Sequence, residues 1–93
     1  MTNLANLIWE RVVATQGQPF HTIEGKTFYH AVDGSGIRPY PNGRATNRRI
    51  TRTQFDEAVS RCPLQRTTDL RDLIGASYLF GLLMDRRIRQ SAW

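Results

Sequence analysis

Residues 20–40, FHTIEGKTFYHAVDGSGIRPY, predict a small antiparallel β-sheet. Two runs rich in aromatic and β-branched residues, 20–23 and 26–32, flank Glu24-Gly25, a two-residue hairpin signal. If Ile23 pairs with Lys26, side-chain alternation divides the hairpin into two faces. One face carries His21, Ile23, Phe28, His30 and Val32, and the other carries Phe20, Thr22, Tyr29 and Ala31.

The chain beyond this hairpin continues the predicted sheet. Residues 33–36, DGSG, form a turn that leads to a short third strand over 37–40. Pro39 favours an edge position for that strand because proline cannot donate a hydrogen bond to a neighbour. Residues 41–43, PNG, form a second turn, and a short fourth strand over 47–50 with Ile50 facing inward is compatible with the pattern.

Before the sheet, residues 3–15 predict an amphipathic helix. The apolar side chains recur at helical spacing, and the helix ends at residues 16–19, QGQP. Because Trp9 and Val13 widen the apolar stripe, we expect this helix to pack on a sheet or on two neighbouring helices.

After residue 51 the apolar period becomes helical. Thr51 and Gln54 fit a capping box for a helix over 52–61, which Cys62-Pro63 ends. A third helix is predicted to begin after Thr67 or Thr68, because aspartates in its first turn suit a helix N-terminus. Residues 75–77, GAS, either break that helix and cap a new one or form a small-residue patch that allows close packing. Residues 78–88 predict a strongly apolar last helix.

These elements together predict an α+β fold. We expect residues 1–93 to form a single domain with an N-terminal helix, a three- to four-stranded antiparallel β-meander, and two or three helices packed on one sheet face. The lone Cys62 excludes an internal disulfide, and no apolar run reaches the roughly 18 residues of a membrane span. We therefore expect a soluble cytoplasmic protein.

The basic charge is concentrated in residues 34–55, GSGIRPYPNGRATNRRITRTQF. This stretch contains five arginines and no acidic residue, and the formal net charge of the whole chain is +5. Arginine forks bind phosphates, and an aromatic ring can stack on a base. The candidate nucleic-acid-binding residues are Arg38, Tyr40, Asn42, Arg44, Asn47, Arg48, Arg49 and Arg52.

The same concentration of arginine is compatible with two further interpretations. The basic stretch can equally dock an acidic protein partner, or its arginines can be solvated and balanced by Asp56, Glu57 and the aspartates of the third helix. Arginine also dominates the basic residues of the whole chain, 12 to one lysine, and genome base composition alone produces such a bias. Trp93 either is loosely ordered or docks onto the body or a second copy.

The remaining chemically active side chains do not form a catalytic or metal-binding pattern. His21, His30 and Cys62 lack metal-ligand spacing, so we predict no metal and no cofactor. Glu24 and Lys26 have the spacing of some nucleases, but a hairpin turn explains them and a second convergent acid is missing. We therefore predict a protein that is not an enzyme.

Three segments carry a resemblance to a broad group of proteins: GKTFYHAV (25–32), RRITRTQF (48–55) and SYLFGLLMDRRI (77–88). With them, the chain resembles small orphan proteins of bacterial mobile elements, such as integron cassettes and phages, and restriction-associated accessory domains. The resemblance implies a bacterial or phage setting and assigns no site residue. Our prediction is a binding module, alone or as a homodimer, that presents Arg38–Arg52 to nucleic acid; the alternative is an accessory or inhibitor module that docks an acidic protein.

Overall fold

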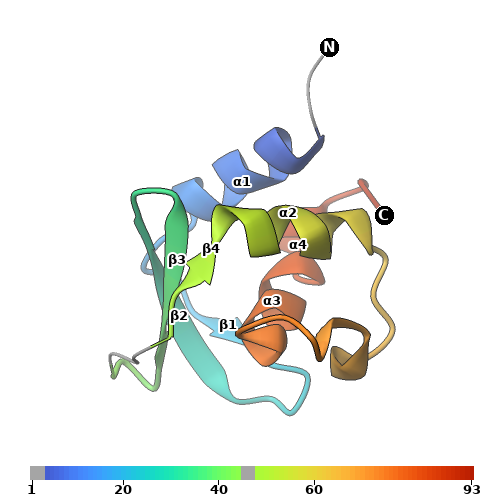
Figure 1. The fold of residues 1–93 in the computed structure, drawn as a ribbon. Coiled ribbons are helices and arrows are strands. Elements are labelled where there is room, and N and C mark those ends of the chain that lie inside the picture. The colour runs from blue at the N-terminus through green and yellow to red at the C-terminus, as the bar shows by residue number, and fades with distance from the viewer. Residues whose placement is uncertain (1–3, 45–47) are drawn as a thin grey trace.

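The computed structural model describes residues 4–44 and 48–93 of the chain. Within these ranges the elements follow one another as α1 (Leu4–Ala14), β1 (Phe20–His21), β2 (Thr27–Asp33), β3 (Gly36–Pro41), β4 (Ile50–Thr51), α2 (Arg52–Ser60), the 3-10 helix η1 (Thr67–Leu70), α3 (Ala76–Leu83) and α4 (Arg86–Arg89) (Figure 1). This order confirms the predicted α+β fold.

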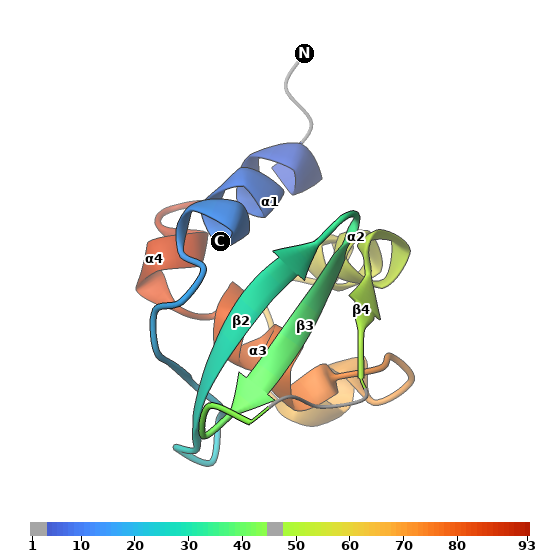
Figure 2. The ribbon, with the colours of Figure 1, turned by 90° about the vertical axis from the view of Figure 1, so that its left-hand side faces the viewer.

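The strands form one antiparallel sheet in the order β1-β2-β3-β4. Figure 2 shows β2 and β3 nearest the viewer, with α2 and α3 behind them and α1 above. The helices that follow the sheet therefore cover one of its faces, as predicted. None of the described helices lies over the opposite face of β2 and β3.

The predicted register of the first hairpin is wrong by one residue. Phe20 pairs with Phe28 and His21 with Thr27, so His21 does not lie opposite Phe28. The reason is a longer connection: the N–H of Gly25 donates to the carbonyl of Thr22, and residues 22–26 form a loop instead of a two-residue turn. Phe20 consequently joins Phe28 on the covered face, with ring centroids 6.1 Å apart.

Pro39 lies in a strand that has a neighbour on each side, which differs from the predicted edge position. β3 sits between β2 and β4, but β4 pairs only with Gly36 and Ile37. Pro39 lies beyond those two residues and is paired with His30 of β2. The proline therefore does not interrupt a ladder with β4, which explains why it is tolerated in this strand.

The core fills the space between the covered sheet face and the helices. The sheet contributes buried Phe28, Ile37 and Ile50, each fully inaccessible to solvent. The remaining fully buried apolar side chains are Ile8, Val12, Phe20, Phe55, Ala58, Leu70, Leu79, Leu82, Leu83 and Ile88. Such burial is the main driving force for the fold, because each large apolar side chain contributes about 1.5–3 kcal/mol.

The helix α2 follows the prediction closely, whereas the helices after it are shorter. Thr51 caps α2 by accepting a hydrogen bond from the N–H of Gln54. The predicted third helix is only the four-residue η1, and Ile74, which follows it, is 47% exposed. Gly75 then adopts a left-handed conformation (φ 74°) and starts α3 anew, which is one of the two expected roles of the GAS segment.

The last predicted helix is divided at Asp85. This residue is extended, and its carboxylate accepts a hydrogen bond from the N–H of Arg87, so it caps the separate short helix α4. Trp93 docks on the body, because its indole Nε1 donates to the carbonyl oxygen of Leu83 at 3.0 Å. The chain's last residue therefore covers the junction between the two helices.

Candidate nucleic-acid interface

The open sheet face consists of Tyr29 and Ala31 on β2 and Arg38 and Tyr40 on β3. Successive side chains of a strand point to opposite faces of the sheet. Phe28 and His30 are buried beneath the helices, as are Ile37 and Pro39. The four intervening residues therefore face away from the core, on the side that Figure 2 shows uncovered.

Tyr29 and Tyr40 are directly opposite each other across the two strands. Directly opposed residues of an antiparallel pair place their Cβ atoms about 4.5–5.5 Å apart, so the two phenol rings occupy neighbouring positions. Both rings are half-buried and are not among the side chains packed on the core. They provide two aromatic side chains, from opposed backbone positions, on a face that α2 and α3 do not cover.

Arg38, which lies two residues before Tyr40 on the same face, and Arg49, which lies toward the β2–β3 turn, share one carboxylate. Arg38 Nη2 lies 3.7 Å from Asp33 Oδ2, and Arg49 Nε lies 3.8 Å from the same oxygen. Arg49 Nη2 also donates to the backbone carbonyl of Asp33 at 2.7 Å. Asp33 therefore orients both guanidinium groups and offsets part of their charge.

Gly36 is needed for this arrangement. A Cβ atom at this position would lie 2.5 Å from Arg49 Cζ, which is closer than real side chains approach one another. The guanidinium of Arg49 therefore lies directly over the glycine backbone. A larger residue at position 36 would displace the arginine from the sheet.

The turn after β3 presents Arg44 at the end of the sheet. Asn42 (φ 54°) and Gly43 (φ 78°) are both left-handed, and the N–H of Arg44 donates to the carbonyl of Pro41 at 3.0 Å. Positive φ at both central residues is the signature of a type I′ turn, for which Asn-Gly is a favoured sequence. Asn42 thus has a structural reason for its position, and both it and Arg44 are exposed. The candidate Asn47 lies outside the described residues.

Arg52 lies apart from the open sheet face. Its Nε donates to Asp56 Oδ1 at 2.7 Å, its guanidinium lies 4.8 Å from the centre of the Trp9 ring, and Nη2 contacts Asn6 Oδ1. These contacts connect the start of α2 with α1. Arg48 is exposed and lines a pocket on the helix side instead of the sheet face. The predicted single arginine face is therefore divided between three places.

The acidic residues of α2, and Asp72 after η1, are bound to arginines outside this face. Asp56 pairs with Arg52, while Arg61 pairs with both Glu57 and Asp72. The bidentate contact with Arg61 lowers the pKa of the Asp72 carboxyl to about 2. The predicted balance of charge by these acids holds for Arg52, which pairs with Asp56. Glu57 and Asp72 instead pair with Arg61, which lies outside residues 34–55, and Asp33 is the carboxylate that pairs with Arg38 and Arg49.

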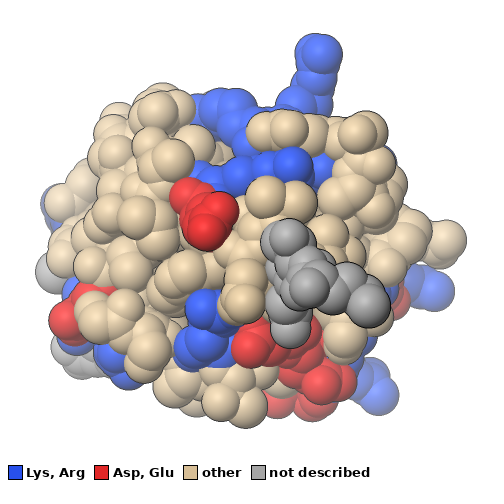
Figure 3. Space-filling view, turned by 90° about the horizontal axis from the view of Figure 1, so that it is seen from above, with Lys and Arg blue, Asp and Glu red and all other residues tan. Residues whose placement is uncertain are grey.

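Basic side chains also gather elsewhere. Figure 3, seen from above Figure 1, shows a band of Lys and Arg across the upper part of the view and acidic side chains toward its lower edge. On α4, Arg87 binds Asp85 and lies 3.9 Å from the centre of the Phe20 ring, and Arg11 donates to the carbonyl of Ile88 at 2.9 Å. These two arginines hold α4 in place, so their positions have a structural explanation.

The other candidate chemical groups remain separate. Among residues 4–44 and 48–93, no three His, Cys, Asp or Glu side chains lie together in a way that could hold a metal ion. Burial raises the pKa of the Cys62 thiol to about 12, which disfavours the nucleophilic thiolate. Glu24 and Lys26 form an exposed ion pair at 3.5 Å within the first loop. In the part of the chain that the structure describes, no helix has the length and apolar character needed to span a membrane.

Comparison of the chain with protein-family models, curated proteins and solved structures found no match. The site is therefore interpreted from its own residues. Sequence reasoning did not include Tyr29 or Asp33 among the candidate residues. The alternation of β2 would have identified Tyr29, because it separates this ring from Phe28 and His30, but no local pattern indicates that Asp33 pairs with two distant arginines.

Proposed function

We propose that this protein is a non-enzymatic module that binds single-stranded nucleic acid on the open sheet face. The observation that carries the proposal is the directly opposed pair Tyr29 and Tyr40, which lies on an uncovered face beside Arg38. Aromatic rings on a sheet stack unpaired bases, and neighbouring arginines bind the phosphates between them.

The geometry favours a single strand over a duplex. The bases of a duplex are stacked on one another, so their flat faces are not accessible to tyrosines on a sheet. Major-groove recognition normally inserts a helix or a β-ribbon, whereas α2 and α3 pack here against the covered sheet face. Bases stacked on Tyr29 and Tyr40 would place the backbone within reach of Arg38, Arg49 and Arg44.

The proposal is tested by fluorescence anisotropy with a labelled single-stranded oligonucleotide at low salt. Loss of a stacking ring costs about 1–3 kcal/mol, so Tyr40→Ala is expected to weaken binding roughly 5- to 150-fold. Tyr40→Phe keeps the ring and should retain most of the affinity. Asp33→Asn should strengthen binding, because it removes the carboxylate that offsets Arg38 and Arg49.

Two arginine variants distinguish binding on this face from attraction to the overall positive charge of the protein. Arg38→Ala should reduce both the affinity and its salt dependence, by about 0.7 in the slope of log K against log salt for each lost phosphate contact. Arg66→Ala removes the same charge from an exposed site on the helix side and should have little effect. Equal losses in both variants would contradict the proposed face. Oligonucleotide binding that is unchanged by Tyr29→Ala and Tyr40→Ala but requires Arg38 would contradict base stacking and indicate contact through the phosphates alone.

A further inference from the structure

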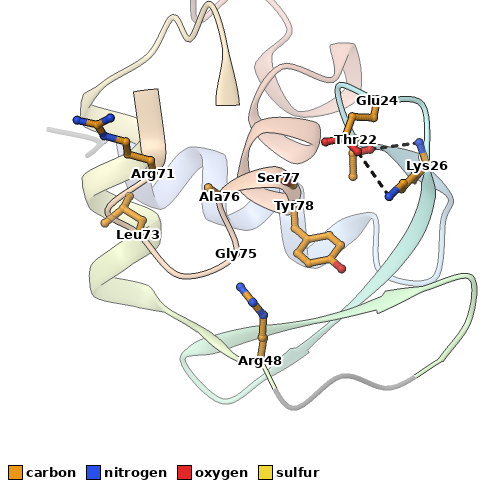
Figure 4. A pocket seen from close by; sticks show the side chains of 10 residues that line it. All are labelled: Thr22, Glu24, Lys26, Arg48, Arg71, Leu73, Gly75, Ala76, Ser77 and Tyr78. Atoms are coloured by element: carbon orange, nitrogen blue, oxygen red, sulfur yellow. Dashed lines mark hydrogen bonds and ion pairs between the residues drawn. The ribbon is translucent and has the colours of Figure 1, made fainter. Parts of the chain in front are cut away.

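A separate basic pocket lies between the first β-hairpin loop and the start of α3. It has a volume of about 420 Å³. Figure 4 shows its lining residues, which come from three distant parts of the chain: Thr22, Glu24 and Lys26 from the β1–β2 loop, Arg48 before β4, and Arg71, Leu73, Gly75, Ala76, Ser77 and Tyr78 around the start of α3.

The lining carries an excess of positive charge. Lys26, Arg48 and Arg71 are the basic members, and Glu24, the acidic one, is paired with Lys26 at 3.5 Å. In Figure 4, Arg48 points across the opening toward Gly75, and Lys26 lies on the other side of the Tyr78 ring. The Arg71 side chain, at the far end beside Leu73, extends away from Arg48 and Gly75. Lys26 and Arg48 make the lining basic on both sides of the Tyr78 ring, and a basic lining suits an anionic ligand.

The acids closest to Arg71 in the sequence are engaged away from the pocket. Asp72, which follows Arg71 in the chain, makes its bidentate contact with Arg61. Asp69 accepts hydrogen bonds from the N–H groups of Gln65 and Arg66, and these bonds lower the pKa of its carboxyl. The Asp69 carboxylate therefore stabilises the start of η1, and the Asp72 carboxylate binds Arg61 at the end of α2.

The backbone adds hydrogen-bond donors to the three cations. The first N–H groups of a helix have no partner within the helix, and α3 begins at Ala76 without a side-chain cap. Glycine is required just before this helix end, because a Cβ atom at position 75 would lie 2.8 Å from Ile50 Cδ1. The hydroxyl-bearing residues Ser77 and Tyr78 line the same space. The helix end alone would not define a site, but here it faces a cavity that already contains the cations.

We propose that this pocket binds a phosphate monoester group, carried by a small molecule or by the end of a nucleic-acid strand. A dianionic phosphate offers several oxygen acceptors, which match the lysine and arginine donors and the N–H groups at the start of α3. The pocket volume lies in the range of small-molecule sites and leaves room for a group attached to the phosphate. This site is independent of the open sheet face.

The test is an amide chemical-shift titration of the full chain with inorganic phosphate and with adenosine 5′-monophosphate. Saturable shifts are expected at the amides of Ala76, Ser77 and Tyr78. Arg48→Ala and Lys26→Ala should each weaken binding about tenfold, the effect of losing one charged hydrogen bond. Arg86→Ala, which removes an arginine from α4, should leave the affinity unchanged. Shifts that do not saturate, or equal losses in all three variants, would overturn the proposal.

Two further measurements complete this experiment. Ser77→Pro removes one N–H group in the first turn, where proline is tolerated, so it should reduce phosphate affinity while the helical circular dichroism is retained. A 5′-phosphorylated trinucleotide that binds more tightly than adenosine 5′-monophosphate identifies a strand end as the source, and the reverse order identifies a small molecule. Tyr40→Ala should not affect inorganic phosphate binding, so failure of this proposal is distinguishable from failure of the proposed function.

Discussion

Gly81 allows α3 to approach the sheet, and its replacement by alanine should destabilise the fold. A Cβ atom at this position would lie 2.5 Å from the backbone carbonyl oxygen of His21 and 2.8 Å from Phe28 Cε1. Glycine to alanine in a helix interior normally stabilises by about 1 kcal/mol. Overpacking of a core costs about 1–3 kcal/mol, and the contact with a strand backbone places this site in the upper part of that range. We therefore expect a net loss of about 1–2 kcal/mol.

Urea and thermal unfolding of Gly81→Ala measure this loss. For a domain of this size, about 1–2 kcal/mol corresponds to a melting temperature lowered by roughly 5–15 °C. Thr53→Ala provides the control, because Thr53 is an exposed residue of α2 where alanine raises helix propensity without a new contact. A Gly81→Ala protein as stable as the natural chain, or more stable, would refute the close approach of α3 to β1.

Two titratable groups lead to further predictions. Burial lowers the pKa of His30, and Arg87 lowers it further, although Nε2 hydrogen-bonds the carbonyl of Val12 at 2.8 Å. As the pH falls, His30 is therefore protonated in the unfolded chain before it is protonated in the folded protein. Stability to urea should consequently fall as the pH drops below 6.5, the ordinary pKa of histidine. A His30→Asn variant should lack this decline. Cys62, with its pKa raised to about 12, should have about one thiolate in ten thousand molecules at pH 8. It should react with a disulfide reagent far more slowly in the folded protein than in urea, and equal rates would contradict its burial.

The sequence patterns were most reliable where one local signal was sufficient. The cap at Thr51 and the stop at Cys62-Pro63 defined α2 to within one residue, because both act through the nearest turns of backbone. The segment around Asp69 was misread because aspartates suit the first turn of a helix and equally suit η1, where Asp69 accepts bonds from Gln65 and Arg66. Local propensity does not distinguish one 3-10 turn from a longer helix.

The candidate site was predictable in composition but not in arrangement. The concentration of arginine in residues 34–55 is plain in the sequence, yet the fold sends Arg38 and Arg49 to the open sheet face, Arg48 to the pocket and Arg52 to the contact with α1. A strand reverses the direction of its side chains at every residue, so close neighbours in sequence are separated in space.

From the sequence alone followed the α+β class, the order of the elements, one core and an excess of positive charge, because these depend on periodicity, turn residues and composition. Only the tertiary structure decided that Phe20 pairs with Phe28, that Tyr29 lies opposite Tyr40, and that Lys26, Arg48 and Arg71 line one pocket. Pairing register and the convergence of distant segments depend on how the helices and the sheet pack together, and no local pattern encodes that packing.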